Sequence, residues 1–112
     1  MVARTIVVPS TKKNPITVSR ATTVMGIRRT ILEAELKLQF AEETDIARRI
    51  GAVTIYPSLA ACSSAKKLPT VEEFLDMDGE LSDAWCDAAM TLNPRWFEFR
   101  VETPKEIEKK ES

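Results

Sequence analysis

Residues 68–97, LPTVEEFLDMDGELSDAWCDAAMTLNPRWF, decide the fold class of this chain. Thr70 and Glu73 stand three positions apart, which is the spacing of a capping box at the start of a helix. At the other end Asn93-Pro94 is typical of a helix stop, because proline disfavours the helical conformation of the residue before it. The stretch begins and ends with helix signals, and we expect it to be helical between them.

A break near residues 77–79 divides this stretch into two short acidic helices. We expect the second helix to begin near Glu80, with acidic residues in the first turns, where the helix dipole favours negative charge. Its apolar residues recur every three or four positions, as on the buried face of an amphipathic helix. The residues expected to be buried there are Leu81, Trp85, Ala88 and Leu92.

Residues 21–43 carry a longer helical pattern. One apolar row comprises Val24, Ile27, Ile31, Ala34 and Leu38. A second set widens this row and comprises Met25, Leu32, Leu36 and Phe40. Thr17 or Ser19 could cap the helix start, and Glu33 precedes Lys37 by the four positions that favour an ion pair. So wide an apolar face predicts a central helix that is covered on more than one side.

A further helix is expected after Asp45, a typical capping residue. Residues 53–56 are β-branched enough to form a strand instead, but the ten residues before them have helical spacing and favour the helix. Pro57 is expected to end or kink this helix, and it can also open the next turn. Residues 63–67 have the composition of a linker.

Two short β-branched runs, residues 5–8 and 16–19, stand near the start of the chain and are separated by the turn-rich sequence PSTKKNP. This pattern predicts a hairpin or a strand pair. Two strands alone are barely stable in water. We therefore expect them to pack on the helices or to pair with another copy.

The predicted fold class is mainly α, a small helical domain of about four to five helices with a short N-terminal β-hairpin or strand pair. The chain has 112 residues, which suits one domain. We assign residues 1–102 to it, with a β element at 1–19, central helices at 20–66 and an acidic helical unit at 68–102. Residues 103–112 are charged and poorly apolar, and we expect a mobile tail.

The composition argues against an enzyme and against a metal or cofactor site. The chain has no histidine, so the usual base beside a nucleophile is missing. Its two cysteines have no CxxC spacing, and its three glycines are too dispersed for a phosphate-binding loop. We also see no signal peptide and no stretch as long as a membrane span. The expected location is the cytoplasm.

Charge is unevenly distributed along the chain, although the net charge is −1. Residues 1–37 carry seven basic groups, whereas residues 70–93 carry seven acidic groups and no basic one. This asymmetry can drive head-to-tail self-association, which we expect, or docking on a basic partner, and it can also be a simple solvated face. We expect no nucleic-acid binding, because the pI is 5.6 and aromatic residues are not interleaved with the basic ones.

Aromatic residues near the end of residues 68–97 are the candidate partner-binding residues. Trp96 and Phe97 follow a helix stop, where side chains can be exposed, and tryptophan is a common hot spot of interfaces. Both residues could equally belong to the core. Trp85 and Leu92 lie on the apolar stripe, and we expect them to support Trp96 and Phe97 from the core.

Residues 47–97 resemble one family, the tail assembly chaperones of long-tailed (siphovirus-type) bacteriophages. The resemblance lies in the order and spacing of four pieces. These are Tyr56-Pro57-Ser58-Leu59, Leu68-Pro69-Thr70, the acidic stretch from Leu81 to Trp85, and Leu92-Asn93-Pro94-Arg95-Trp96-Phe97. The first third of the chain matches this family only in general character.

The resemblance implies a protein that binds the phage tape measure protein and keeps this long helical chain soluble during tail tube assembly. It also implies a place in the host bacterial cytoplasm and absence from the mature virion. A longer form made by frameshifting could reach the tail tube protein. The alternatives are a virion structural component, such as a tail completion or connector protein, and a small DNA-binding regulator.

Overall fold

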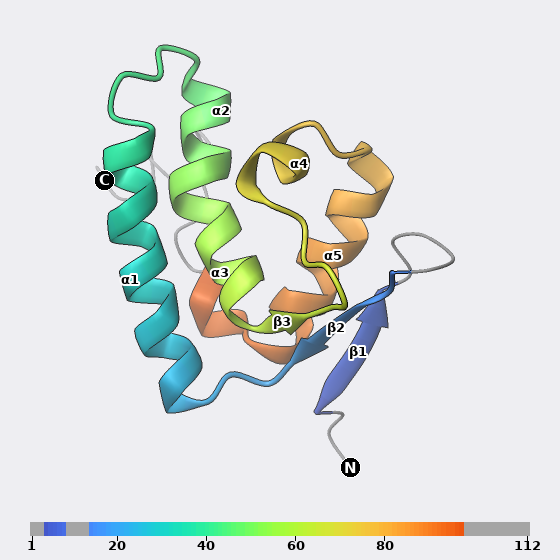
Figure 1. The fold of residues 1–112 in the computed structure, drawn as a ribbon. Helices are drawn as coiled ribbons and strands as arrows, with labels where there is room; N and C mark the ends of the chain where they lie inside the picture. Colours follow the sequence, from blue (N-terminus) through green and yellow to red (C-terminus); the bar gives the residue numbers. More distant parts are fainter. Residues whose placement is uncertain (1–3, 9–13, 98–112) are drawn as a thin grey trace, which may run out of the picture.

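The structure is a computed structural model, and it describes residues 4–8 and 14–97 (Figure 1). These residues form a mainly helical fold with an N-terminal antiparallel strand pair, which confirms the predicted fold class. The predicted tail at 103–112 and the last residues of the predicted acidic unit lie outside the described residues.

Strands β1 (Thr5–Val8) and β2 (Ile16–Ser19) form the predicted hairpin-like pair, with Val8 opposite Ile16. A third short strand, β3 (Ser63–Ser64), pairs antiparallel with β2 and makes β2 the central strand. The interpretation of residues 63–67 as a plain linker is therefore wrong at its first two residues. Two serines carry no strand pattern of their own, and their position beside β2 is fixed by the helix that precedes them.

Helix α1 (Thr23–Gln39) begins later than expected. Thr22 is its cap, and its hydroxyl accepts a hydrogen bond from the Met25 N–H at 3.3 Å. The expectation of a cap at Thr17 or Ser19 is wrong, because both residues belong to strand β2. The predicted ion pair along the helix is present, with Lys37 Nζ 3.3 Å from Glu33 Oε1.

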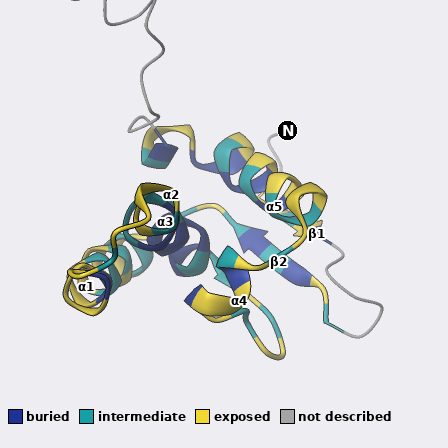
Figure 2. Cartoon of the chain, turned by 90° about the horizontal axis from the view of Figure 1, so that it is seen from above, coloured by how far each residue is buried: buried dark blue, intermediate teal, exposed yellow. Residues whose placement is uncertain are grey.

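Helix α1 lies at the edge of the molecule, and its outer side faces solvent (Figures 1 and 2). Leu36 and Phe40 are buried, with Met25 and Leu32 packed beside them. The first apolar row points away from the core, and its exposed large members are Val24, Ile27, Ile31 and Leu38. The prediction of a helix covered on more than one side is therefore wrong. The other helices of this short chain cover α1 on one side only, so the opposite apolar row stays exposed to solvent.

Residues 46–61 form one continuous helical segment of three parts, α2 (Ile46–Ile50), the π-helical turn η1 (Gly51–Ile55) and α3 (Tyr56–Ala61). Asp45 caps its start, as expected, by accepting from the Ala47 N–H at 3.0 Å. The helical prediction for residues 53–56 is also confirmed.

Pro57 does not end this helical segment, because the wide turn η1 precedes it. An α-helix cannot place proline in its interior without losing a hydrogen bond and bringing the ring against a carbonyl one turn back. In η1 the Tyr56 N–H bonds to the Gly51 carbonyl, five residues earlier. A π-type turn of this kind relaxes the helix where an α-helix would be strained, and Pro57 then fits in the first turn of α3.

Helices α4 (Val71–Leu75) and α5 (Gly79–Leu92) are the two predicted acidic helices. The capping box of α4 is present, with Thr70 Oγ1 3.2 Å from the Glu73 nitrogen and Glu73 Oε1 3.1 Å from the Thr70 nitrogen. Asp78 caps α5. After Asn93 the chain forms a single 3₁₀ turn, η2 (Pro94–Phe97).

The core lies where α5 crosses strands β1 and β2 and meets α3 (Figure 1). Alternate residues of β2, Ile16 and Val18, are fully buried. The rings of Tyr56, Phe74 and Trp85 form a cluster, with centroids 5.7–6.5 Å apart. This cluster joins α3, α4 and α5 into one apolar interior.

Candidate protein-interaction surface

The solvent-facing row of α1 holds four of the six large hydrophobic residues that are exposed among the described residues. We call it the outer seam, and it consists of Val24, Ile27, Ile31, Ala34 and Leu38. All five residues are exposed, and the four large ones keep 54–82% of their surface accessible. Their spacing alternates between three and four residues, which is the a/d spacing of a coiled-coil helix. Apolar residues that gather on one exposed face, unlike single scattered ones, are typical of an interaction site.

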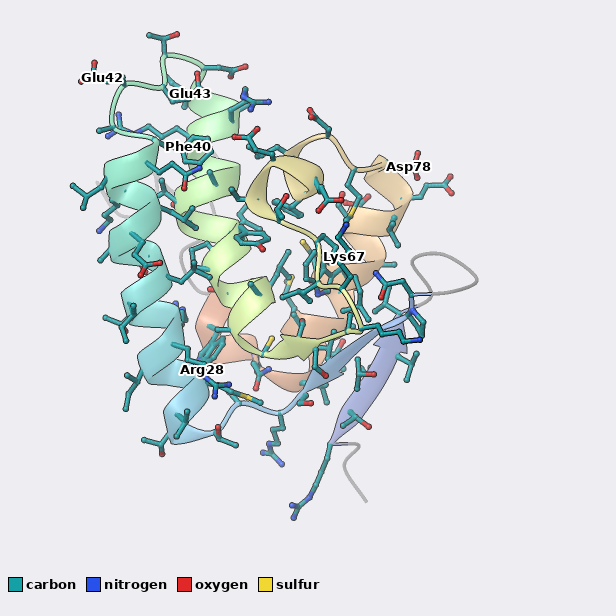
Figure 3. All side chains as sticks on the ribbon, in the orientation of Figure 1. Arg28, Phe40, Glu42, Glu43, Lys67 and Asp78 are labelled. Atoms are coloured by element: carbon teal, nitrogen blue, oxygen red, sulfur yellow. The ribbon has the colours of Figure 1, made fainter. Side chains whose placement is uncertain are left out.

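A shallow groove continues the outer seam toward α3. It has a volume of about 350 Å³, and Ile31 belongs to both the seam and the groove. Its floor is apolar and includes Leu32, Ala60 and Leu68. Arg28 and Glu35 line it as well, so the apolar surface carries one positive and one negative side chain along the same border (Figure 3 labels Arg28).

The four residues predicted from sequence as a partner-binding group do not form an open surface. Trp85, Leu92 and Phe97 are buried, with 0%, 7% and 6% of their surface exposed. The expectation that Trp85 and Leu92 lie in the core is confirmed. Trp96 is half-buried against the same core. A contribution of Trp96 and Phe97 to partner binding stays a prediction.

Trp96 holds the turn η2 against the helices. The guanidinium carbon of Arg29 lies 4.9 Å from the centroid of the Trp96 ring, within the range of a cation–π contact. Arg29 Nη2 also donates to the Trp96 carbonyl at 3.4 Å, and Ser58 Oγ lies 3.5 Å from the same oxygen. Arg29 is therefore occupied within its own chain, and Arg28 is the neighbouring base that faces solvent.

Glu72, Glu73 and Asp76 are three of the seven acids in residues 70–93, and each has a structural partner on another residue. Arg48 lies 3.0 Å from a carboxylate oxygen of Glu43, 2.9 Å from one of Glu72 and 3.8 Å from one of Asp76. The pairs with Glu72 and Asp76 connect α2 with α4, whereas Glu43 lies in the loop before α2. The pKa of Glu73 is lowered because its carboxylate accepts the hydrogen bond from the Thr70 backbone within the capping box. This part of the acidic charge therefore stabilises helix contacts.

Three further acids form a solvated face on α5. Glu80, Asp83 and Asp87 are exposed along this helix. Cys86 is half-buried beside Asp83 and Asp87, and burial, with these two aspartates adding to it, raises its pKa from 9.0 to about 11. Burial also raises the pKa of Cys62. Both thiols are free and are protonated at neutral pH, so neither has the properties of a catalytic nucleophile.

We expect Cys86 to react slowly with iodoacetamide in the folded chain. A pKa two units higher leaves about 100-fold less thiolate below pH 9. The same shift lowers the stability of the fold in alkaline solution: the contribution of the neutral thiol is complete below pH 9.0 and is lost as pH rises toward about 11. Rates of Cys86 alkylation with and without urea at pH 8 test the expected slow reaction of the folded chain, and equal rates would contradict it.

The described parts of the chain, residues 4–8 and 14–97, contain no group of three or more Cys, Asp or Glu residues that could hold a metal ion. No helix in these parts has both the length and the apolar character needed to cross a membrane. Comparison with protein-family models, with curated proteins and with solved structures gave no match.

The sequence carries a signal that one apolar row of α1 stays open, but it does not show which row. Its five residues and the buried set of Met25, Leu32, Leu36 and Phe40 lie on opposite sides of one helix at 3.6 residues per turn. A chain of this length cannot easily cover both sides. Arg28 and Glu35 border the seam. Charged residues flank the apolar row of a coiled-coil helix in the same way.

Proposed function

We propose that this chain is a tail assembly chaperone of a long-tailed bacteriophage. In this proposal it binds the tape measure protein in the host cytoplasm, keeps it soluble until the tail tube forms around it, and is absent from the mature virion. The resemblance of residues 47–97 to this family gives the proposal its client. The outer seam of α1 is the single structural observation that carries it.

The outer seam suits a helical client. An amphipathic helix binds a second helix by laying its apolar residues along a row of this spacing. The seam and the groove beside it would cover about four turns of client helix, since α1 has 17 residues. Each copy would shield one short segment, so a long client would need many copies.

The charged border limits how a client helix can lie on the seam. Arg28 and Glu35 are seven residues apart on one side of α1, so they are about 10 Å apart along the helix axis. A client helix with an acid and a base at matching positions would be favoured in one direction. Binding through apolar contacts with a light charge pattern tolerates many client segments, as a chaperone requires.

Lysine at two seam positions tests this function. We expect Ile27→Lys/Ile31→Lys to change the free energy of unfolding of the isolated chain by less than about 1 kcal/mol, because both side chains already face solvent. On co-expression with the tape measure protein, the double variant should leave the client insoluble, whereas the natural chain should form a soluble complex of many copies with one client.

Ile46→Lys is the matched control. Ile46 is 71% exposed but belongs to α2 and is not one of the outer seam residues. It should solubilise the client as well as the natural chain does. Equal solubilisation by the seam variant and the control would overturn the proposed site, and failure of the natural chain itself would overturn the proposed function. Mass spectrometry of purified virions then tests the structural-component alternative, in which the chain stays in the particle.

A further inference from the structure

The outer seam is self-complementary, because its border carries one base and one acid. Arg28 and Glu35 lie on the same side of the seam and both line the groove beside it. None of the ion pairs within the described residues uses either of them. We infer that two copies of this chain pair antiparallel through the outer seam, with Arg28 of each copy beside Glu35 of the other.

The helical spacing fixes one register for this pair. In an antiparallel coiled coil, a positions face d positions of the partner helix, and here Ile27 would face Leu38 of the second copy. Ile31 would face Ala34 of the second copy, where the small side chain lets the helices approach closely. In the same register Arg28 stands beside Glu35 of the second copy. Each contact occurs twice, because the interface is isologous.

A parallel pair does not use these charges. In a parallel coiled coil, residues flanking the seam pair g with e, which would place Arg28 beside Thr23 of the second copy and Glu35 beside Thr30. Neither contact is an ion pair. The two charged residues therefore favour the antiparallel arrangement and discriminate against the parallel one.

The dimer is expected to be weak. Helix α1 has 17 residues and is about 25 Å long, so two such helices bury less than the roughly 1,200 Å² of a stable interface. We expect a dissociation constant of roughly micromolar magnitude, as for weak, transient pairs. The role of the dimer rests on the proposed function. A client helix would take the place of the second copy, so the dimer keeps the outer seam covered until a client is present.

Charge reversal tests the pairing on the full-length chain alone, without any client. R28E places two carboxylates beside each other at both charged contacts of the dimer, and E35R places two guanidinium groups together there. Each single variant should weaken dimerisation at least about tenfold, since two favourable pairs become repulsive. Sedimentation analysis over a concentration series in the micromolar range measures this.

Two further samples give the inference its sharpest test. The double variant R28E/E35R restores opposite charges and should dimerise like the natural chain. An equimolar mixture of R28E and E35R should form a heterodimer. At one charged contact the two substituted side chains meet as acid and base, and at the other the unchanged Glu35 of one variant meets the unchanged Arg28 of the other. K66E reverses an exposed charge outside α1 and should leave dimerisation unchanged.

Three results would overturn the pairing. These are a natural chain that stays monomeric across the series, single variants that dimerise normally, and a mixture that does not associate. Thermal unfolding of every variant confirms that the monomers are folded. Because no client is present, these outcomes are independent of tape measure solubility. The pairing can therefore fail while the proposed function stands, and the proposed function can fail while the pairing stands.

Discussion

Replacing Trp85 by alanine is expected to lower the free energy of unfolding by about 4 kcal/mol, because a fully buried indole is removed and a cavity remains. The ring contacts Tyr56 and Phe74 edge-on, with centroids 6.5 and 5.8 Å away. Its Nε1 donates to Ser63 Oγ at 2.9 Å, which connects α5 with strand β3. A small domain has roughly 5–15 kcal/mol in total, so this variant should be close to unfolding. Urea denaturation followed by circular dichroism measures the loss.

Two variants separate the contributions of size, hydrogen bonding and position. Trp85→Phe keeps an aromatic ring but loses the donor to Ser63, and should cost about 2 kcal/mol. Trp96→Ala removes the other tryptophan, which is half-buried, and should also cost less than Trp85→Ala. If Trp96→Ala proves the more damaging change, the turn η2 and not α5 would be the centre of the fold.

Asn93→Ala is expected to lower the free energy of unfolding by about 2 kcal/mol, although asparagine contributes little apolar area. Asn93 is 7% exposed. Its Oδ1 accepts the Ala21 N–H at 2.7 Å, and its Nδ2 donates to the Ser19 carbonyl at 3.0 Å. The Ala21 N–H would lose its side-chain acceptor in a partly buried place. Urea denaturation measures the cost, and hydrogen exchange at Ala21 shows whether the damage is local.

Asn14 offers a matched control for Asn93. It makes the same two-way contact with a backbone segment, donating to the Lys67 carbonyl at 2.7 Å and accepting from the Lys67 N–H at 3.2 Å. These atoms are solvent-accessible, so water can replace the lost bonds. Asn14→Ala should therefore cost less than half as much as Asn93→Ala. Equal costs would mean that burial does not decide the contribution of Asn93.

Local signals predicted the helices and strands of this chain well. The capping box of Thr70 and Glu73 and the helix stop at Asn93-Pro94 involve neighbouring residues, so the sequence alone contains them. The strand pair follows from two β-branched runs with a turn between them. Strand β3 was missed because Ser63-Ser64 takes its conformation from its neighbour β2.

Local signals do not show which side of α1 faces the core. Both apolar rows have helical spacing, and which row meets the core depends on where α3 lies. The role of Trp96 was equally hidden, because its partner Arg29 is 67 residues away. The sequence pattern therefore predicted the residues of the outer seam as one apolar row. The expectation that other elements cover this row is wrong, because the row faces solvent.

The hydrogen bonds of Asn93 set the order in which the chain can acquire its native structure during synthesis. They join residues 72 and 74 positions apart in sequence, so the passage from β2 into α1 stays open until Asn93 has left the ribosome. Contacts of such long range form late. The N-terminal strands and α1 are therefore made early but completed last, and during this interval the nascent chain exposes both apolar sides of α1.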